Sequence, residues 1–198
     1  MTTSISGSVL QAVRAMRPVL DEHRSWADEH ACMAPAVLAA SRDAGIFTLL
    51  APREVGGAEA SLPEALAVCE ELAAGDATVF WHAGNSAALG LAAAYLRPED
   101  RAAVFAGPPG PYGFSIVRGG MATPVDRGYR LTGRWPFLTG ARDVTWAGVN
   151  GVVHDSAGPR LVDGMPDVRL FIVPATDLHV VNAIAVRFEH PPQFADAS

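Results

Sequence analysis

The feature that most constrains the fold is a change of residue pattern around "FAGPPGPYG", residues 105–113. Before it, apolar residues recur at helical spacing; after it, short runs rich in β-branched and aromatic residues alternate with turn residues. Pro108, Pro109 and Pro111 favour a linker in the stretch itself, because proline fixes φ and removes a backbone donor. We therefore predict an α+β chain, in which an N-terminal all-α helical domain, residues 1–109, precedes a small antiparallel β-barrel or β-sandwich domain, residues 110–198.

The helical half contains one helix start that can be argued in detail. Ser61 can cap the first turn while Glu64, three residues on, reaches back to the backbone, which is the pattern of a capping box. From about Asp76, "DATVFWHAGNSAALGLAAAYL" reads as a helix that is apolar on nearly all sides, so we predict that it is the central helix. Further helices are expected over three other segments, residues 9–30, 34–47 and 98–105, and Pro18 is expected to kink the first of them.

The second half shows a series of short β-rich runs divided by turn residues. "DRG", residues 126–128, is expected to form a hairpin turn, since glycine adopts a positive φ at no steric cost. The predicted strands cover residues 112–117, 121–125, 129–135, 146–153, 168–175 and 178–186.

Composition argues against several functions. A net charge of −6 and a pI near 5.4 disfavour a nucleic-acid partner, because phosphate binding needs a basic face. No apolar run approaches the roughly 18 residues of a membrane span, and no signal pattern opens the sequence, so we expect a cytoplasmic protein without a membrane partner. His154, His179 and His190 are scattered without metal-ligand spacing, so we predict no metal site.

Two blocks of the sequence together resemble the acyl-CoA dehydrogenase superfamily. "DAGIFTLLAPREVGGAEASLPEALAVCEELAAGDAT", residues 43–78, is similar to a loop and helix of the family's helical domain. "ATPVDRGYRLTGRWPFLTGARDVTW", residues 122–146, is similar to the hairpin and flavin-facing strand of its β domain. The dehydrogenases usually carry "T-E-P" and "G-S-D" elements in the first β strands, and residues 113–128 lack them. The resemblance is therefore closest to the family's flavin-dependent monooxygenase branch, the two-component hydroxylases.

The resemblance implies a flavin site on the strand that holds Phe137, Thr139 and Gly140. In this interpretation Phe137 offers an apolar wall to the flavin ring, Thr139 a hydrogen bond near its N5 atom, and Gly140 room for the backbone to come close. Ser115 lies where family members place flavin-contacting groups, so it is a further cofactor-binding candidate. The alternative for the strand is an ordinary barrel strand with alternating faces, and for Ser115 an exposed or turn-directed hydroxyl.

One histidine is a candidate catalytic residue. His82 and Ser86 are four residues apart, on one face of the predicted central helix. Some monooxygenases of the family have a histidine from this region near the flavin, so His82 is expected to hold or pass a proton. The alternative is a histidine packed into a helix interface and satisfied by a backbone carbonyl.

The function implied by the resemblance is that of a flavin-dependent oxidoreductase, the N-terminal part of a two-component monooxygenase. Reduced FMN or FAD would come from a separate reductase, and O₂ would be used on a small organic substrate. The alternative within this class is oxidation of an acyl thioester, as in acyl-CoA dehydrogenases. The alternative of another class is a non-catalytic remnant, or a scaffolding or binding subunit.

The expected partners follow from the same resemblance. Family members continue after the β domain into a C-terminal helical bundle, which supplies part of the flavin pocket and most of the subunit interface. We predict no such bundle in these 198 residues. A companion chain that supplies it, and an oligomeric assembly, are therefore expected.

Overall fold

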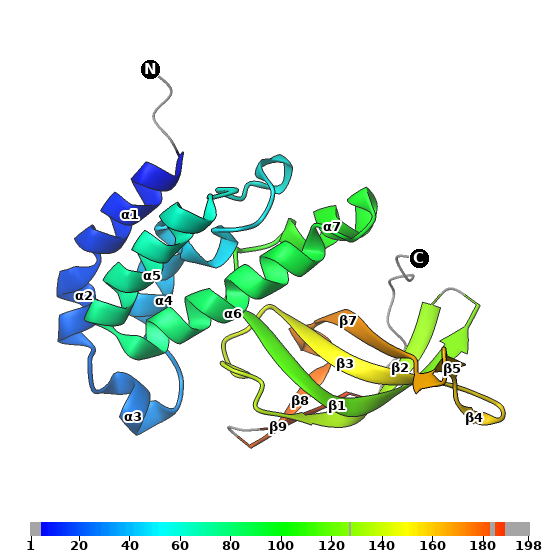
Figure 1. The fold of residues 1–198 in the computed structure, drawn as a ribbon. Coiled ribbons are helices and arrows are strands. Elements are labelled where there is room, and N and C mark those ends of the chain that lie inside the picture. The colour runs from blue at the N-terminus through cyan, green and yellow to red at the C-terminus, as the bar shows by residue number, and fades with distance from the viewer. Residues whose placement is uncertain (1–4, 127, 183–184, 189–198) are drawn as a thin grey trace. The chain divides into compact units, whose positions relative to one another are not determined.

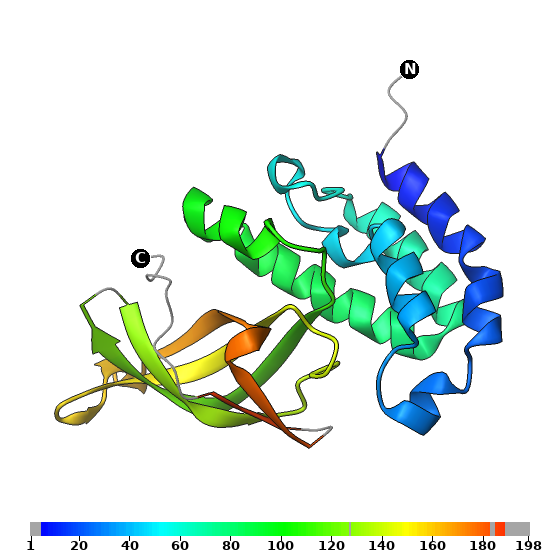
Figure 2. The ribbon, with the colours of Figure 1, turned by 180° about the vertical axis from the view of Figure 1, so that it is seen from behind.

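The computed structural model describes residues 5–126, 128–182 and 185–188. The chain divides into two compact units, Met1–Tyr112 and Gly113–Ser198. The first is helical and the second is a β sheet, coloured blue to green and green to red in Figures 1 and 2. This confirms the predicted order of a helical region followed by an antiparallel β region. The assignment of residues 1–109 and 110–198 to two separate domains stays a prediction.

The helical unit contains seven α helices within the described residues. They are α1 Ile5–Ala15, α2 Arg17–Glu22, α3 Trp26–His30, α4 Pro35–Asp43, α5 Leu62–Gly75, α6 Ala77–Ala93 and α7 Pro98–Phe105, with 3-10 turns η1 Ile46–Thr48 and η2 Arg53–Val55. The segment predicted over residues 9–30 is helical, but it is divided into parts of α1, α2 and α3, and the break between α1 and α2 lies close to the predicted kink at Pro18. Pro18 lies in the first turn of α2, where its missing N–H has no helical partner to lose.

Local capping fixes the longest helices. Ser61 and Glu64 form the predicted capping box, in which the Ser61 N–H donates to Glu64 Oε2 at 2.9 Å. Asp76 ends α5 and begins α6, and its Oδ1 accepts from the N–H groups of Thr78 at 2.8 Å and Val79 at 3.0 Å. This single residue between the helices turns the chain back, so that α5 and α6 lie side by side (Figures 1 and 2).

The β unit is built on one sheet of seven described strands. Their order is β4-β3-β1-β2-β9-β8, with β7 pairing to β3, and the short β5 and β6 form a separate hairpin. The bounds are β1 Tyr112–Val125, β2 Gly128–Pro136, β3 Trp146–Asp155, β4 Gly158–Pro159, β5 Leu161–Val162, β6 Met165–Pro166, β7 Val168–Pro174, β8 Leu178–Asn182 and β9 Ala185–Phe188.

Two strand predictions differ from the structure. The runs over residues 112–117 and 121–125 are one strand, β1, because Gly119 and Gly120 break the sequence pattern without breaking the strand. These glycines are needed for close packing, since a Cβ on Gly120 would lie 2.2 Å from Cζ2 of Trp135. The strand predicted over residues 178–186 is instead the antiparallel hairpin β8–β9, and residues 183–184 lie outside the described part.

The predicted hairpin between the first two long strands is confirmed at its ends. β1 and β2 pair antiparallel from Gly120↔Gly133 to Val125↔Gly128, and residue 127 lies outside the described residues. The core of the unit gathers under these strands around the fully buried Trp135, together with Ala122, Tyr129, Leu131, Leu138, Ala147, Val149, Val153 and Val173.

Candidate functional site

The predicted flavin-facing strand ends earlier than the sequence pattern indicates. β2 stops at Pro136, and Phe137, Thr139 and Gly140 lie in the loop that leads to β3. The placement of these three residues on a strand is therefore wrong. Phe137 has φ 60° and Gly140 has φ 64°, and backbone in this left-handed region cannot continue a β ladder.

The loop is anchored at its centre and closed at its end. Leu138 is 1% exposed and belongs to the β core. The Gly140 carbonyl accepts from the N–H groups of Asp143 at 2.7 Å and Val144 at 3.1 Å. Phe137, just before the buried leucine, is held outward with 71% of its surface exposed. The flat apolar ring of Phe137 is therefore exposed to solvent, while the next residue, Leu138, is buried in the β core.

Ser115 lies beneath the start of this loop. It is 2% exposed on β1, and its Oγ donates to the Pro136 carbonyl at 2.8 Å. The serine is therefore neither exposed nor part of a local turn. The structure brings Ser115 together with the residue that precedes Phe137.

His82 and Ser86 share a buried face of α6, as their spacing indicates. His82 is 5% exposed and Ser86 is fully buried. The Ser86 Oγ accepts from the Tyr112 N–H at 3.0 Å, which ties the linker to α6. His82 lies in the helical unit, whereas Ser115 and the loop of Phe137, Thr139 and Gly140 lie in the β unit.

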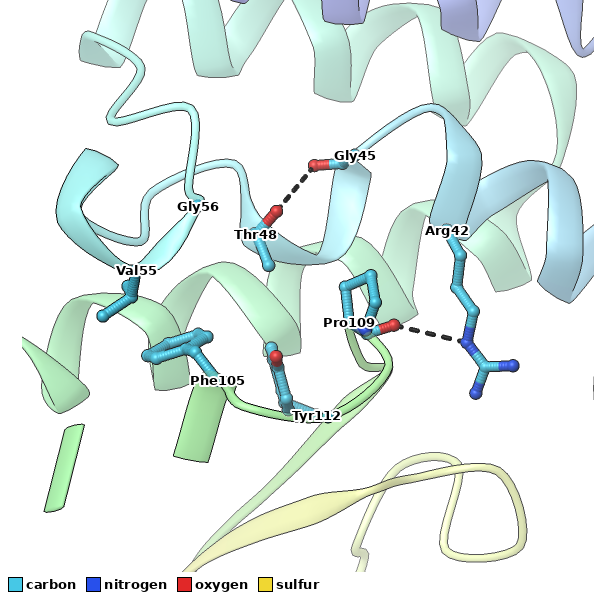
Figure 3. A pocket seen from close by; sticks show the side chains of 9 residues that line it. Arg42, Gly45, Thr48, Val55, Gly56, Phe105, Pro109 and Tyr112 are labelled. Carbon is cyan, nitrogen blue, oxygen red and sulfur yellow. Dashed lines mark hydrogen bonds between the residues drawn. The ribbon is translucent and has the colours of Figure 1, made fainter. Parts of the chain in front are cut away.

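The helical unit also contains a pocket that was not foreseen from the sequence (Figure 3). It has a volume of about 270 Å³ and is lined by Arg42, Gly45, Thr48, Val55, Gly56, Phe105, Gly107, Pro109 and Tyr112. Phe105 and Tyr112 meet edge to face, with ring centroids 5.6 Å apart. Both the "PREVGG" loop and the proline-rich linker contribute to the lining, and their proximity depends on long-range packing that neither motif predicts by itself.

The polar side chain of Arg42 in this pocket hydrogen-bonds to the proline-rich linker. Arg42 Nε donates to the carbonyls of Pro109 at 3.3 Å and Gly110 at 3.0 Å, and Figure 3 shows the first of these bonds. Burial raises the pKa of the Tyr112 phenol above its ordinary value, so this tyrosine stays neutral at physiological pH. These hydrogen bonds hold the proline-rich linker against Arg42 of the helical unit.

No described helix is both long and apolar enough to cross a membrane. Within the same described residues, no three His, Cys, Asp or Glu side chains gather in a way that could hold a metal ion.

Comparison with known proteins identifies the family. Residues 9–104 match the model of the acyl-CoA dehydrogenase N-terminal domain. The chain is 32% identical over 164 residues to the oxygenase component of an FADH₂-dependent resorcinol hydroxylase from Rhizobium sp. (strain MTP-10005), a match covering 80% of this chain and 38% of that protein. The chain spans less than half the length of the curated relatives it matches, with shares of 35%, 38% and 44%.

Solved structures show the same fold. XiaF from Streptomyces sp., in complex with FADH₂ and glycerol, superposes with a TM-score of 0.81 at 22% identity, over 95% of this chain and 49% of that one. FMN-bound TdsC from Paenibacillus sp. A11-2 gives a TM-score of 0.69 at 20% identity, over 93% and 50% of the two chains. The helical unit therefore belongs to the acyl-CoA dehydrogenase N-terminal domain family, and the chain is homologous to oxygenases of two-component flavin systems.

Proposed function

We propose that this chain carries flavin-facing parts of a two-component monooxygenase. In such a system a separate reductase delivers reduced flavin, and O₂ is used to oxygenate a small organic substrate. The observation that carries the proposal is the exposed ring of Phe137 on an anchored loop. The support from homology is the 32% identity to an FADH₂-dependent oxygenase component.

The loop residues fit the chemistry of a flavin. An isoalloxazine ring needs a flat apolar surface, which the Phe137 side chain supplies without further rearrangement. Thr139 is partly buried in the same loop, two residues after Phe137, and carries a hydroxyl that can hydrogen-bond. Gly140 has no side chain to keep the flavin edge from the backbone. We propose that Phe137, Thr139 and Gly140 contact the flavin, with Thr139 directed to the N5 region.

His82 and Ser115 complete the proposal with different roles. Reduced flavin, when bound, supplies the activation of O₂. His82, buried on α6, is proposed to hold or move a proton at its ring nitrogens during turnover. Ser115 is proposed to contribute to the flavin site from the base of the loop, where its hydroxyl donates to the Pro136 carbonyl.

The direct test is an anaerobic titration of the chain with reduced FAD and reduced FMN, followed by fluorescence. Phe137→Ala is expected to weaken binding by about tenfold or more, because a large apolar contact is lost. Met165→Ala is the matched control, since Met165 is also an exposed apolar side chain of the β unit, at 67%. Equal affinities for the two variants, or no binding by the unsubstituted chain, would refute the proposed flavin site.

The second candidate, oxidation of an acyl thioester, is favoured by the match to the acyl-CoA dehydrogenase N-terminal domain. The two reactions are separated by adding an acyl-CoA to the flavin-loaded chain without oxygen. Bleaching of oxidised flavin by the acyl-CoA would support the dehydrogenase. Oxygen-dependent product formation from a phenolic substrate with a reductase present would support the monooxygenase.

A further inference from the structure

The end of β2 is held differently on its two sides. On one side the ladder to β9 continues through Trp135↔Val186 and Pro136↔Ala185. On the other side, within the part of the chain that the structure describes, the ladder to β1 extends along β2 only as far as Gly120↔Gly133. Those last residues lead directly to Phe137, and their position decides where the exposed ring lies.

Two side-chain hydrogen bonds take over where that ladder stops. Ser115 Oγ donates to the Pro136 carbonyl at 2.8 Å, from a side chain that is 2% exposed. The indole N–H of Trp135 donates to the Asn150 carbonyl at 2.6 Å. The two residues before Phe137 are thus each fixed by one bond that is not part of the sheet ladders.

Asn150 closes the connection between the three strands. Its main-chain carbonyl on β3 accepts a hydrogen bond from the Trp135 indole N–H of β2, and its side-chain Nδ2 donates to the Ile116 carbonyl of β1 at 3.0 Å. Ile116 directly follows Ser115. A carboxamide is required for this bond, because an aspartate at the same place would set two acceptors against each other.

We propose that Ser115 and Asn150 form a brace that positions Phe137 for the flavin. Both are positioning residues: the Ser115 hydroxyl acts through the Pro136 carbonyl, and the Asn150 side chain acts through the Ile116 carbonyl, next to Ser115 on β1. The proposal rests on the proposed function for its flavin part, whereas its claim about the loop stands on the contacts alone. Loss of either bond is expected to loosen the loop while the β core stays folded.

The loop claim is tested without flavin, by amide hydrogen exchange in Ser115→Ala, Asn150→Ala and Asn150→Asp. The reporters are the Asp143 and Val144 amides, which bond to the Gly140 carbonyl and close the loop. Their exchange is expected to quicken about five- to tenfold, the equivalent of one lost hydrogen bond. Amides of the β3 core are expected to keep their rates. Unchanged rates at Asp143 and Val144, or an equal rise throughout the sheet, would overturn the brace.

Asp155→Ala is the matched control. Asp155 lies at the far end of β3, and the substitution also removes one hydrogen bond between a side chain and the main chain, which the Ala157 N–H donates to Asp155 Oδ1 at 2.8 Å. It is expected to leave the exchange of the loop amides unchanged.

The flavin claim is tested on the same variants with reduced FAD. Asn150→Asp is expected to raise the Kd about fivefold and to shift the fluorescence spectrum of the bound flavin, with Asp155→Ala unchanged. Wild-type affinity in a variant whose loop amides exchange faster would overturn the positioning role. If the wild-type chain binds no flavin, the proposed function fails, while the exchange experiment still decides whether the brace exists.

Discussion

The two units of this chain differ in how far apart in the sequence the residues lie that fix their helices and strands. In the helical unit the contacts that begin the long helices are local: Asp76 caps α6 through residues two and three positions away. In the β unit they are distant: Ser115 reaches Pro136 across 21 residues and Asn150 reaches Ile116 across 34. Local contacts tolerate errors elsewhere in the fold, whereas distant ones form only when the whole sheet does. The predictions that follow test this contrast.

The largest effect is expected from Trp135→Ala. The indole is fully buried in the β core, and its removal leaves a large cavity and deletes its hydrogen bond to the Asn150 carbonyl. A loss of about 3–5 kcal/mol in the free energy of unfolding is expected, measured by urea denaturation. The control is Trp81→Ala, because Trp81 is 60% exposed on α6. A similar loss in both variants would contradict the contrast.

Glycine replacements are expected to have opposite signs in the two units. A Cβ on Gly133 would lie 2.3 Å from the Gly119 carbonyl oxygen, so Gly133→Ala must move backbone and is expected to cost about 1–3 kcal/mol. A Cβ on Gly84, inside α6, would meet nothing within 4 Å, so Gly84→Ala should stabilise by about 0.5–1 kcal/mol. Melting temperatures that shift in the same direction would show that the packing assigned to one of these sites is wrong.

A cap deletion is expected to cost less than the core change. Asp76→Ala removes the acceptor for the Thr78 and Val79 N–H groups, and a loss of about 1 kcal/mol is expected. Glu70→Ala, which removes an exposed carboxylate from the interior of α5, serves as the comparison. Thermal unfolding followed at 222 nm measures both. The cap assignment fails if the two variants melt at the same temperature.

The smallest effect is expected in the pH dependence of the β unit. Hydrogen bonding from the Arg160 guanidinium lowers the pKa of Asp167, with Arg169 adding to the effect. Because the folded-state pKa lies below the unfolded value of about 3.9, the stabilisation is fully present above that value and is lost as the pH falls through the lowered pKa.

Asp167→Asn tests this assignment. Wild type is expected to be the more stable protein at pH 7, and the two unfolding curves should approach each other below about pH 4. A constant difference between wild type and Asp167→Asn from pH 7 to pH 2.5 would show that the carboxylate's charge is not responsible.

The sequence predicted best what depends on neighbouring residues. The capping box of Ser61 and Glu64, the start of α6 after Asp76 and the change to strands after the proline-rich linker all follow from residues a few positions apart. The order of helices and strands could be read for the same reason.

The course of the chain beyond Pro136 could not be predicted from neighbouring residues. Trp135, Phe137 and Thr139 are aromatic or β-branched residues that favour a strand, although the backbone turns to φ 60° at Phe137. That turn is stabilised by the burial of Leu138 and by contacts from β1, which no local pattern contains. The role of Asn150 was missed for the same reason, because an asparagine within a β run carries no signal of its partner on another strand.

The central claim is that the β unit presents a preformed loop to the flavin, and chemical shifts test it most directly. An isotope-labelled chain would be titrated anaerobically with reduced FAD, and backbone amide shifts recorded residue by residue. The largest shifts are expected in the β unit at Phe137, Thr139 and Gly140, with the core strands little affected. Saturable binding that leaves these three amides unshifted while others move would contradict it.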